Sequence, residues 1–276
     1  MIDLSISWNP NPIIIEVFSY PVRWYSIFWM IAIISGAIVV HHIFKVKKLS
    51  DEEFSRLFIY SFCGIIIGAR LGHCIFYDPT YYINHPLEIF LPIKFLPNNR
   101  VVFTGYAGLA SHGGTLGLLI SLYLFHLKSK IEYIVILDII AIAAPLSAAF
   151  IRIANFMNSE IIGVETTMPW GVIFEQVDYI PRHPAQLYEA IAYIVFFIIL
   201  CLIYKRKKNI QSGFYLGLCI FMIFTFRFLI EFLKERQVDF ENNMPIDMGQ
   251  ILSIPFIICG LYLLIKSTCK KASSIN

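Results

Sequence analysis

The segment Arg152–Gly163 places an arginine, two asparagines, a serine and a glutamate directly after a long apolar run, Ile134–Ile151. If helical geometry continues through this segment, Arg152 shares a face with Asn155, and Asn155 shares one with Asn158. A guanidinium beside fixed polar side chains can hold an anion such as a phosphate. The alternative is that Arg152 merely extends to a membrane surface while the amides cap the helix end.

Further charged and histidine residues gather near the ends of other apolar runs. Arg227 and Glu231 are four residues apart and can form an ion pair if both are helical. His112 precedes Gly113 and Gly114, two glycines that permit close helix approach; it is either a neutral base or a structural residue. Ionisable groups in hydrocarbon are costly and usually mark function. The ionisable residues that lie near the ends of apolar runs are Arg23, Arg70, His73, His112, Arg152, Arg182, His183, Arg227 and Glu231.

The composition predicts that membrane-spanning helices position these groups. The 276 residues are 58% hydrophobic and only 15% charged, and the apolar residues form runs of roughly 20, the length that crosses a bilayer. We expect an all-α integral membrane protein, a seven-helix bundle that forms a single domain over residues 1–276. The predicted spans are Trp24–Val40, Leu57–Phe76, Leu109–Phe125, Ile134–Ile151, Ala185–Tyr204, Gly213–Leu233 and Ile251–Ile265.

Lysine and arginine in the connections predict the orientation. Most of the 22 basic residues follow the first, third, fifth and seventh spans, which predicts that these connections are cytoplasmic. The N-terminus is then outside and the C-terminus inside. With this orientation, most of the ionisable residues near the ends of the spans lie in one layer at the depth of the outer leaflet. Asp138, near the inner end of the fourth span, is the exception. Residues 78–105 and 158–181 are predicted to be ordered extracytoplasmic head segments.

Several classes of protein lose support. The chain lacks GxSxG, HExxH and Walker sequences, and its six cysteines have no CxxC spacing, so we expect neither a metal site nor a cofactor. The net charge of +3 reflects the loops and predicts no nucleic-acid partner. A small-anion transporter or channel is one alternative, although its polar groups would lie near the midplane. A non-catalytic scaffold that binds anionic lipid is another.

Arg152–Gly163 resembles the signature of the bacterial prolipoprotein diacylglyceryl transferases, which reads approximately G-R-x-[GA]-N-F-x-N-x-E-x-x-G. The resemblance covers nearly the whole chain, because neighbouring motifs agree in order and spacing. These motifs are Arg23-Trp24-Tyr25, Gly68-Ala69-Arg70-Leu71-Gly72, His112-Gly113-Gly114, Arg182-His183-Pro184-Ala185-Gln186-Leu187-Tyr188-Glu189, Arg227-Phe228 with Glu231, and Met248-Gly249-Gln250 followed by Ile251-Leu252-Ser253-Ile254-Pro255.

The resemblance implies an enzyme of the bacterial plasma (inner) membrane. Such an enzyme transfers a diacylglyceryl group from phosphatidylglycerol to the thiol of the lipobox cysteine in a prolipoprotein signal peptide, and glycerol phosphate leaves. This reaction is the first step of lipoprotein maturation. The implied catalytic residues are His112, Arg152 and Arg227. The implied phosphatidylglycerol-binding residues are Tyr25, Arg70, Gly113, Gly114, Arg152, Asn155, Asn158, Glu160, Gly163, Arg227 and Glu231.

Three positions depart from the family pattern. Ile151 stands where the signature begins with glycine, which is expected to change helix packing. Ile223 stands where a tyrosine is usual, one turn before Arg227, and Lys234 stands where arginine is usual. The roles of these last two positions are left open by the sequence.

Overall fold

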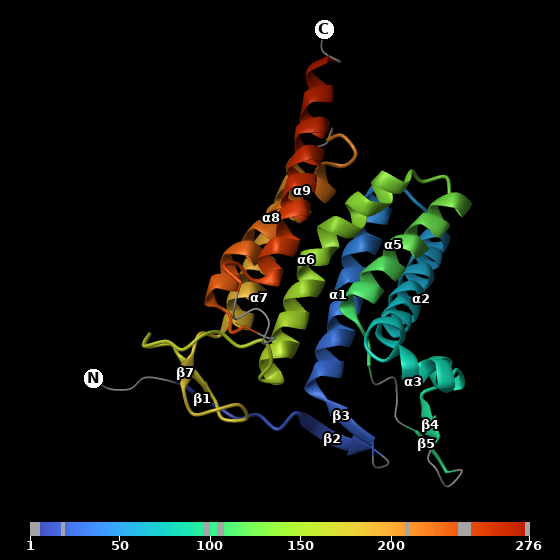
Figure 1. The fold of residues 1–276 in the computed structure, drawn as a ribbon. Coiled ribbons are helices and arrows are strands. Elements are labelled where there is room, and N and C mark those ends of the chain that lie inside the picture. The colour runs from blue at the N-terminus through green and yellow to red at the C-terminus, as the bar shows by residue number, and fades with distance from the viewer. Residues whose placement is uncertain are drawn as a thin grey trace. The chain divides into compact units, whose positions relative to one another are not determined.

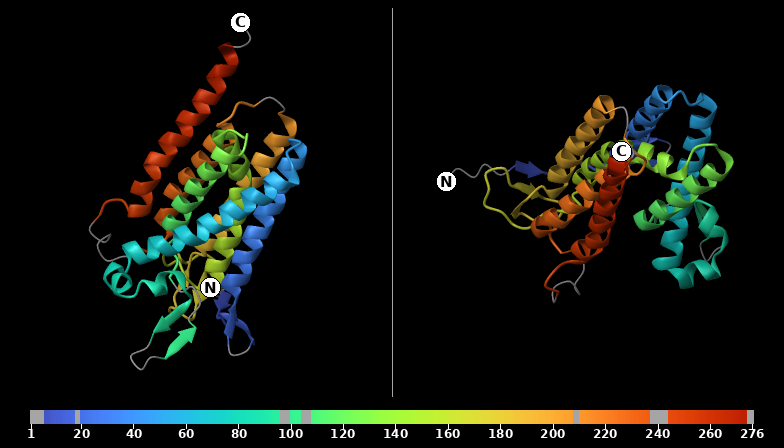
Figure 2. Two further views of the ribbon diagram at one scale, coloured as in Figure 1. Left: turned by 90° about the vertical axis from the view of Figure 1, so that its right-hand side faces the viewer. Right: turned by 90° about the horizontal axis from the view of Figure 1, so that it is seen from above.

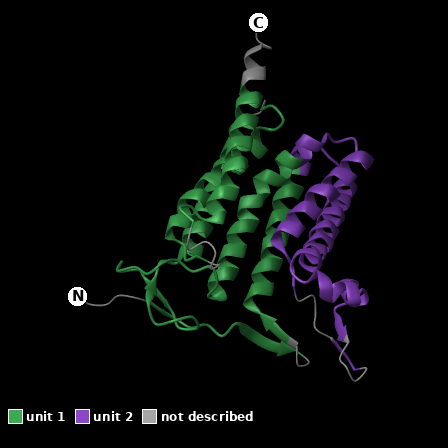
Figure 3. Ribbon diagram, in the orientation of Figure 1, with its two compact units in different colours: residues 1–43, 137–276 green, residues 44–136 purple. Residues whose placement is uncertain are grey.

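The computed structural model describes residues 6–17, 20–95, 100–103, 108–207, 210–236 and 244–273. These residues are mostly helical and form two compact units (Figures 1 and 3). Unit 1 comprises Met1–Ile43 and Leu137–Asn276, and unit 2 comprises Phe44–Ile136. The prediction of a single domain over 1–276 stays a prediction.

Six helices in the described residues are long and apolar enough to cross a membrane, and each coincides with a predicted span. A multi-pass helical membrane protein is therefore confirmed. The third predicted span is also a helix, α5 (Ser111–Lys128), but it is not among the six, because polar and small residues fill its first turns. The six are α1 (Trp24–Val46), α2 (Asp51–Phe76), α6 (Tyr133–Met157), α7 (Ala185–Arg206), α8 (Phe214–Ile230) continued by the 3-10 turn η1 (Glu231–Leu233), and α9 (Met248–Ser273).

Unit 2 is built on a close pairing of α2 with α5 (Figures 1 and 2). Glycines recur every four residues along the contact, at Gly64, Gly68 and Gly72 on α2 and at Gly113 and Gly117 on α5. A Cβ at Gly68 would lie 2.7 Å from the Cα of Gly117, and one at Gly72 would lie 2.7 Å from the Cα of Gly113. The absence of side chains thus lets the two backbones touch, as at small-residue contacts in membranes.

Short elements join α2 to α5 at one end of this pair. They are α3 (Pro79–Asn84), α4 (Leu87–Phe90) and an antiparallel hairpin of β4 (Ile93–Phe95) and β5 (Val101–Phe103). Pro79 stands in the first turn of α3, where its missing N–H costs nothing. The described part of residues 78–105 therefore contains short helices and a hairpin, while its place as an extracytoplasmic head segment stays a prediction. Residues 96–99 and 104–107 lie outside the described part.

In unit 1 the helices pack through small residues and aromatic rings. The hydroxyl of Ser147 on α6 donates to the carbonyl of Ala32 on α1 at 2.7 Å. α8 and α9 lie side by side (Figures 1 and 2), and a Cβ at Gly260 would lie 2.7 Å from the backbone nitrogen of Phe221. Further along this contact the rings of Phe224 and Phe256 stack with centroids 4.3 Å apart.

The structure explains why a carboxylate, Asp138, is buried away from the other ionisable residues near the span ends. Its carboxylate oxygens accept hydrogen bonds from the backbone N–H groups of Gly213, at 2.7 Å, and Leu216, at 2.8 Å. Gly213 has φ of 95° and precedes the first residue of α8. Asp138 on α6 therefore caps the positive N-terminus of α8, which compensates the cost of burying a carboxylate.

The second head segment packs against the end of α6. Strand β1 (Ile6–Trp8) runs parallel to β6 (Val172–Phe174), which pairs antiparallel with β7 (Pro181–Arg182). A small hydrophobic core beside this sheet consists of Phe156, Ile162, Val172 and Phe174, and Trp8 and Leu187 pack against it. A separate hairpin of β2 (Ile13–Val17) and β3 (Tyr20–Arg23) leads directly into α1.

Candidate functional site

The candidate site begins at the end of α6, and the contacts described first all lie within unit 1. Arg152 Nη1 donates to Asn155 Oδ1 at 3.2 Å, as expected for residues three apart on a helix. Asn155 Nδ2 in turn donates to Glu160 Oε1 at 2.8 Å. The helix ends at Met157, although the N–H of Asn158 still donates to the carbonyl of Ala154 at 3.1 Å, and a shared face of Asn155 and Asn158 stays a prediction.

The backbone after α6 adopts an unusual conformation on both sides of Glu160. Ser159 has φ of 52° and Ile161 has φ of 60°, in the left-handed region that β-branched residues such as isoleucine strongly disfavour. The carbonyl of Glu160 is fixed by the side chain of Gln186 at 2.7 Å. Strain of this kind persists where surrounding contacts impose it, and it is concentrated at functional sites.

Three buried polar atoms near this turn have no hydrogen-bond partner within the described residues. They are Oδ1 of Asn158, Oγ of Ser159 and Oε1 of Gln186. Buried polar groups are rarely left unsatisfied unless they serve a function. Their proximity to the strained turn supports a polar binding site around Glu160.

Glu189 on α7 joins two cations within unit 1. Its Oε2 lies 3.2 Å from Arg152 Nε, an ion pair whose geometry falls short of a hydrogen bond. Its Oε1 accepts from Lys234 Nζ at 3.1 Å and from the hydroxyl of Tyr193 at 3.3 Å. Because the Glu189 side chain is 0% exposed, both cations are needed to compensate its burial.

Lys234, the second cation on Glu189, also binds Glu231, with Nζ 3.3 Å from Oε2. The carboxylate of Glu231 lies against the backbone of α9, where a Cβ on Gly249 would come within 2.6 Å of its Cδ. Next to Gly249, Gln250 anchors α9 to α8 by donating to the carbonyl of Phe228 at 3.2 Å. We refer to the connected side chains as the Arg152 cluster, which consists of Arg152, Asn155, Glu160, Glu189, Glu231 and Lys234.

The predicted ion pair between Arg227 and Glu231 is not among the contacts of the described residues. The backbone N–H of Glu231 donates to the carbonyl of Arg227, as in an α-helix, but the carboxylate of Glu231 pairs with Lys234. The side chain of Arg227 forms no hydrogen bond or ion pair within the described part of the chain. Both Arg152 and Arg227 lie within electrostatic range of the Tyr193 hydroxyl, so the two guanidinium groups approach one region.

Tyr25, in the first turn of α1, lies within electrostatic range of Glu160 and Arg152. The structure therefore brings this predicted residue to the Arg152 cluster. The hairpin of β2 and β3 ends one residue before α1 and fixes where the helix begins.

Gly163 has a packing role that its neighbours explain. Its N–H donates to the carbonyl of His183 at 3.0 Å, and it pairs in an isolated bridge with Lys234. A Cβ at this position would lie 2.6 Å from the Cβ of His183 and 2.7 Å from the carbonyl oxygen of Leu233. Glycine is therefore required for the chain to approach the segment that carries Lys234; contact of Gly163 with substrate stays a prediction.

Arg182 stabilises the head segment beside the cluster. It donates to Asp178 Oδ2 at 2.6 Å through Nη2 and at 3.0 Å through Nε, and it forms an ion pair with Glu235 at 3.2 Å. These hydrogen bonds hold the pKa of the Asp178 carboxyl below its ordinary value. Arg182 Nη1 also donates to the carbonyl of Gly163 at 3.3 Å, which connects the head to the cluster.

The remaining predicted site residues lie in unit 2. Arg70 is directed at backbone carbonyls: it donates to Ile89 at 3.1 Å, to Glu88 at 2.5 Å and to Gly108 at 3.4 Å. Its guanidinium also lies 5.0 Å from the ring centroid of Tyr82. These contacts give Arg70 a structural role in joining α2 to the α3–α4 segment, and its contact with lipid stays a prediction.

His112, in the first turn of α5, is exposed and forms no hydrogen bond within the described residues. The adjacent glycines differ from each other. A Cβ on Gly113 would clash with the carbonyl of Gly68 and lie 2.8 Å from the Cα of Gly72, whereas one on Gly114 would meet Ala69 Cβ at an ordinary 3.4 Å. Gly113 therefore serves the pairing of α2 with α5, which positions His112.

Sequence reasoning missed three residues of the site. Glu189 appeared only as the last residue of the motif that begins at Arg182, and Lys234 only as a departure from the family pattern. Tyr193 was not considered. Glu189 did carry a signal, because a carboxylate inside an apolar span requires a buried partner. No group of three metal-ligating side chains is found in the residues that the structure describes, and the absence of a metal site stays a prediction.

Comparison with known proteins connects this geometry to a reaction. Residues 12–266 match the family described as "Prolipoprotein diacylglyceryl transferase". The chain is 56% identical over 260 residues to a phosphatidylglycerol–prolipoprotein diacylglyceryl transferase of Bacteroides fragilis, with 94% of each protein covered. It is 40% identical over 265 residues to the enzyme of that name from Chloroherpeton thalassium, covering 95% of this chain and 94% of the relative. The corresponding enzyme of Tolumonas auensis is 38% identical over 268 residues, covering 96% and 98%.

Proposed function

The chain belongs to the prolipoprotein diacylglyceryl transferase family, and we propose that it takes the diacylglyceryl group from phosphatidylglycerol and transfers it to the cysteine thiol of a prolipoprotein. Diacylglyceryl transfer is the activity of the family, so the alternative of an anion transporter is set aside. In the proposed step the thiolate sulfur attacks the carbon of the diacylglyceryl group that is bonded to the phosphate oxygen. A carbon–sulfur bond forms, the carbon–oxygen bond breaks, and glycerol phosphate leaves with the electron pair.

The observation that carries our assignment of the phosphate ligand is the contrast between Arg227 and the other cations. Arg152 is paired with Glu189, and Lys234 is paired with both Glu189 and Glu231. Arg227 has no such partner within the described residues, although it approaches the same phenol as Arg152. Arg227 is therefore the cation that can form two hydrogen bonds to a phosphate without first breaking an ion pair.

Arg152 has a different role in this proposal. Glu189 and Asn155 hold the Arg152 side chain in place. The guanidinium N–H groups that these contacts do not use can then stabilise the phosphate oxygen on which negative charge develops as the phosphate departs. A donor fixed before the reaction stabilises the transition state without a cost of reorientation. The exposed Glu160, which Asn155 orients, and the nearby Tyr25 provide the polar contacts to the lipid head group.

The thiol of the substrate must lose its proton, because the thiolate is the nucleophile. We assign this proton to His112, whose exposed position and lack of a hydrogen-bond partner in the described residues support a role with substrate. A cationic group that contacts the substrate also favours the thiolate by charge.

We further propose that seven helices span the membrane, with α5 as the seventh, and that the site opens toward the outer leaflet. The lysine-rich connections Lys45–Arg56 and Lys205–Lys208 support this orientation. A cytoplasmically active reporter fused after Asn276 should work, and one inserted in Asp239–Asn243 should not; both positions lie outside the described residues. The reverse pattern would contradict the outer-leaflet site.

The experiment uses the purified full chain with phosphatidylglycerol and a peptide that contains a lipobox cysteine. Mass spectrometry should find a diacylglyceryl thioether on the cysteine and none on a cysteine-to-serine peptide. Arg227→Gln and Arg152→Gln should each lower the rate by roughly 10²-fold or more. Arg227→Lys should recover little, because lysine lacks the planar fork of arginine.

Arg236→Gln is the matched control, because Arg236 is an exposed arginine that pairs with Asp247 outside the cluster. This variant should keep normal turnover. If Arg227→Gln also turned over normally, the phosphate would be held elsewhere. Arg152→Gln should in addition lower stability, since it leaves the buried Glu189 with one cation fewer, whereas Arg227→Gln should not.

A further inference from the structure

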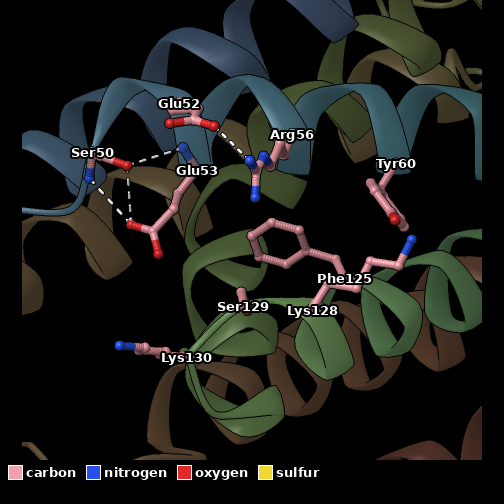
Figure 4. Close-up of a pocket in the computed structure, with 9 residues that line it drawn as sticks. All are labelled: Ser50, Glu52, Glu53, Arg56, Tyr60, Phe125, Lys128, Ser129 and Lys130. Carbon is pink, nitrogen blue, oxygen red and sulfur yellow. Dashed lines mark hydrogen bonds and ion pairs between the residues drawn. The ribbon is translucent and has the colours of Figure 1, made fainter.

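Unit 2 contains a cavity of about 770 Å³ where α2 begins and α5 ends, at the opposite end of the helix pair from His112. Figure 4 shows Arg56 and Tyr60 extending from α2 toward Phe125 and Lys128 of α5. Every residue of its lining belongs to unit 2, so the cavity is separate from the Arg152 cluster. The lining consists of Ser50, Glu52, Glu53, Arg56, Tyr60, Phe125, Lys128, Ser129 and Lys130.

Both carboxylates in the lining are already engaged. Glu52 forms an ion pair with Arg56 at 2.5 Å, one helical turn along α2. The carboxylate of Glu53 accepts from the N–H of Ser50 at 3.2 Å, while the hydroxyl of Ser50 accepts from the N–H of Glu53 at 3.1 Å. This reciprocal pair is a capping box that completes the start of α2. The lining has two carboxylates against three cations, so its net charge is +1.

The two lysines of the lining have no carboxylate partner within the described residues. Lys128 Nζ lies 5.9 Å from the ring centroid of Tyr60, a cation–π distance. Lys130 forms no hydrogen bond or ion pair in the described part of the chain. The cavity therefore keeps an excess of positive charge beside the hydroxyl of Ser129, which is complementary to an anion.

Apolar side chains determine what kind of anion fits. α2 is long and apolar enough to span the membrane, so a cavity around its first turns lies near the depth of lipid head groups. Further along the two helices, Ile59 is 57% exposed, Phe62 38%, Leu124 48% and Leu127 61%. A ligand with an anionic head and long apolar chains satisfies both surfaces, which a free phosphate does not.

We propose that this cavity binds the phosphodiester head group of an anionic phospholipid. Lys128 contacts the phosphate beside Tyr60, and Lys130, whose amine extends to the opposite side in Figure 4, adds positive charge at the rim. The acyl chains extend along the exposed apolar faces of α2 and α5. Basic pockets between membrane helices bind anionic head groups in this way. The bound lipid is a ligand and not the reacting donor, because the cavity shares no residue with the Arg152 cluster.

The test uses the full chain in phosphatidylcholine nanodiscs that contain a small fraction of phosphatidylglycerol with a photoactivatable acyl chain. Cross-links should map to the peptides that contain Ile59–Phe62 and Leu124–Leu127. Lys128→Gln combined with Lys130→Gln should lower this labelling by roughly 30-fold, since each lysine near a membrane surface contributes about 1 kcal/mol to binding of anionic lipid. Transfer activity of the double variant reports that the protein is folded.

Lys205→Gln combined with Lys207→Gln is the matched control, because it removes two exposed lysines from a basic connection in unit 1. Labelling at α2 and α5 should be unchanged in this variant. An equal loss in both double variants would mean general surface attraction, and would overturn the proposal. Complete displacement of the labelled lipid by free glycerol phosphate would also overturn it, because the site would then select a soluble anion.

Discussion

Lys234 Nζ lies 3.1 Å from Oε1 of Glu189, and the two side chains are 4% and 0% exposed. The other oxygen of Glu189 faces Arg152 at 3.2 Å, so one carboxylate holds two cations that come from different segments. Removing one member of a buried ion pair leaves an uncompensated charge, which costs roughly 3–5 kcal/mol. Glu189 thus acts as a positioning residue for Arg152, with Lys234 as its second anchor.

Glu189→Gln should lower kcat and kcat/KM together by roughly 10²-fold, since a small displacement of Arg152 weakens contacts made in the transition state. Steady-state kinetics with varied phosphatidylglycerol would separate this from a binding defect. Lys234→Arg preserves the charge and should keep most of the activity, whereas Lys234→Met should not. Equal losses in both Lys234 variants would mean that shape matters at this position more than charge.

His112→Gln should retain lipid binding and lower the transfer rate by roughly 10²–10⁴-fold, the usual contribution of a general base. A free cysteine thiol has a pKa near 8.5, so hydroxide should replace the missing base as the pH rises. The ratio of variant to native rate should therefore increase with pH. A ratio that stays constant across the pH range would assign His112 a purely structural role.

Gly113→Ala should destabilise the α2–α5 pair, because its Cβ would meet the backbone of Gly68 and Gly72. Gly114→Ala is a control at the adjacent position, where the added Cβ makes ordinary contacts. Unfolding in increasing dodecyl sulfate should show a loss of roughly 1–3 kcal/mol for the first variant only. Equal stability of the two variants would show that the helices do not require this close approach.

The Asp178–Arg182 contact should make the head segment sensitive to acid. Folding lowers the pKa of Asp178, so its contribution to stability is present above about pH 4 and is lost as the pH falls through the lower folded-state pKa. Asp178→Asn should increase hydrogen exchange at the amides of Gly163 and His183 near pH 6, after correction for intrinsic rates. The difference from the native protein should disappear once the pH falls below the folded-state pKa of Asp178. Glu165→Gln, an exposed control, should show no difference.

The sequence was sufficient for the helices and for part of the site. The lengths of the apolar runs located every long helix of the described residues, because a run of about twenty apolar residues is typical of a membrane-spanning helix. The spacing of Arg152 and Asn155 placed both on one face, and their contact at 3.2 Å confirms it. The resemblance also identified the family, which the comparisons confirm.

What the sequence could not supply were contacts between distant segments. Nothing local indicates that Asp138 caps α8 across 75 positions, or that Glu189 pairs with Lys234 across 45. The contact of Glu231 with Lys234 was equally hidden, because Lys234 follows the end of the helical segment.

The division of the chain also sets an order of events during synthesis. Unit 2 is one continuous stretch, Phe44–Ile136, whereas unit 1 combines the N-terminal segment with everything after Leu137. At ordinary rates of translation, roughly 5–20 s pass between the emergence of α1 and that of its partner α6. During that interval α2 and α5 can pair through their glycines, while Ala32 of α1 has yet to meet the hydroxyl of Ser147. The nascent protein can therefore complete its α2–α5 helix pair, with His112 in place, before Arg152 and Arg227 have been synthesised.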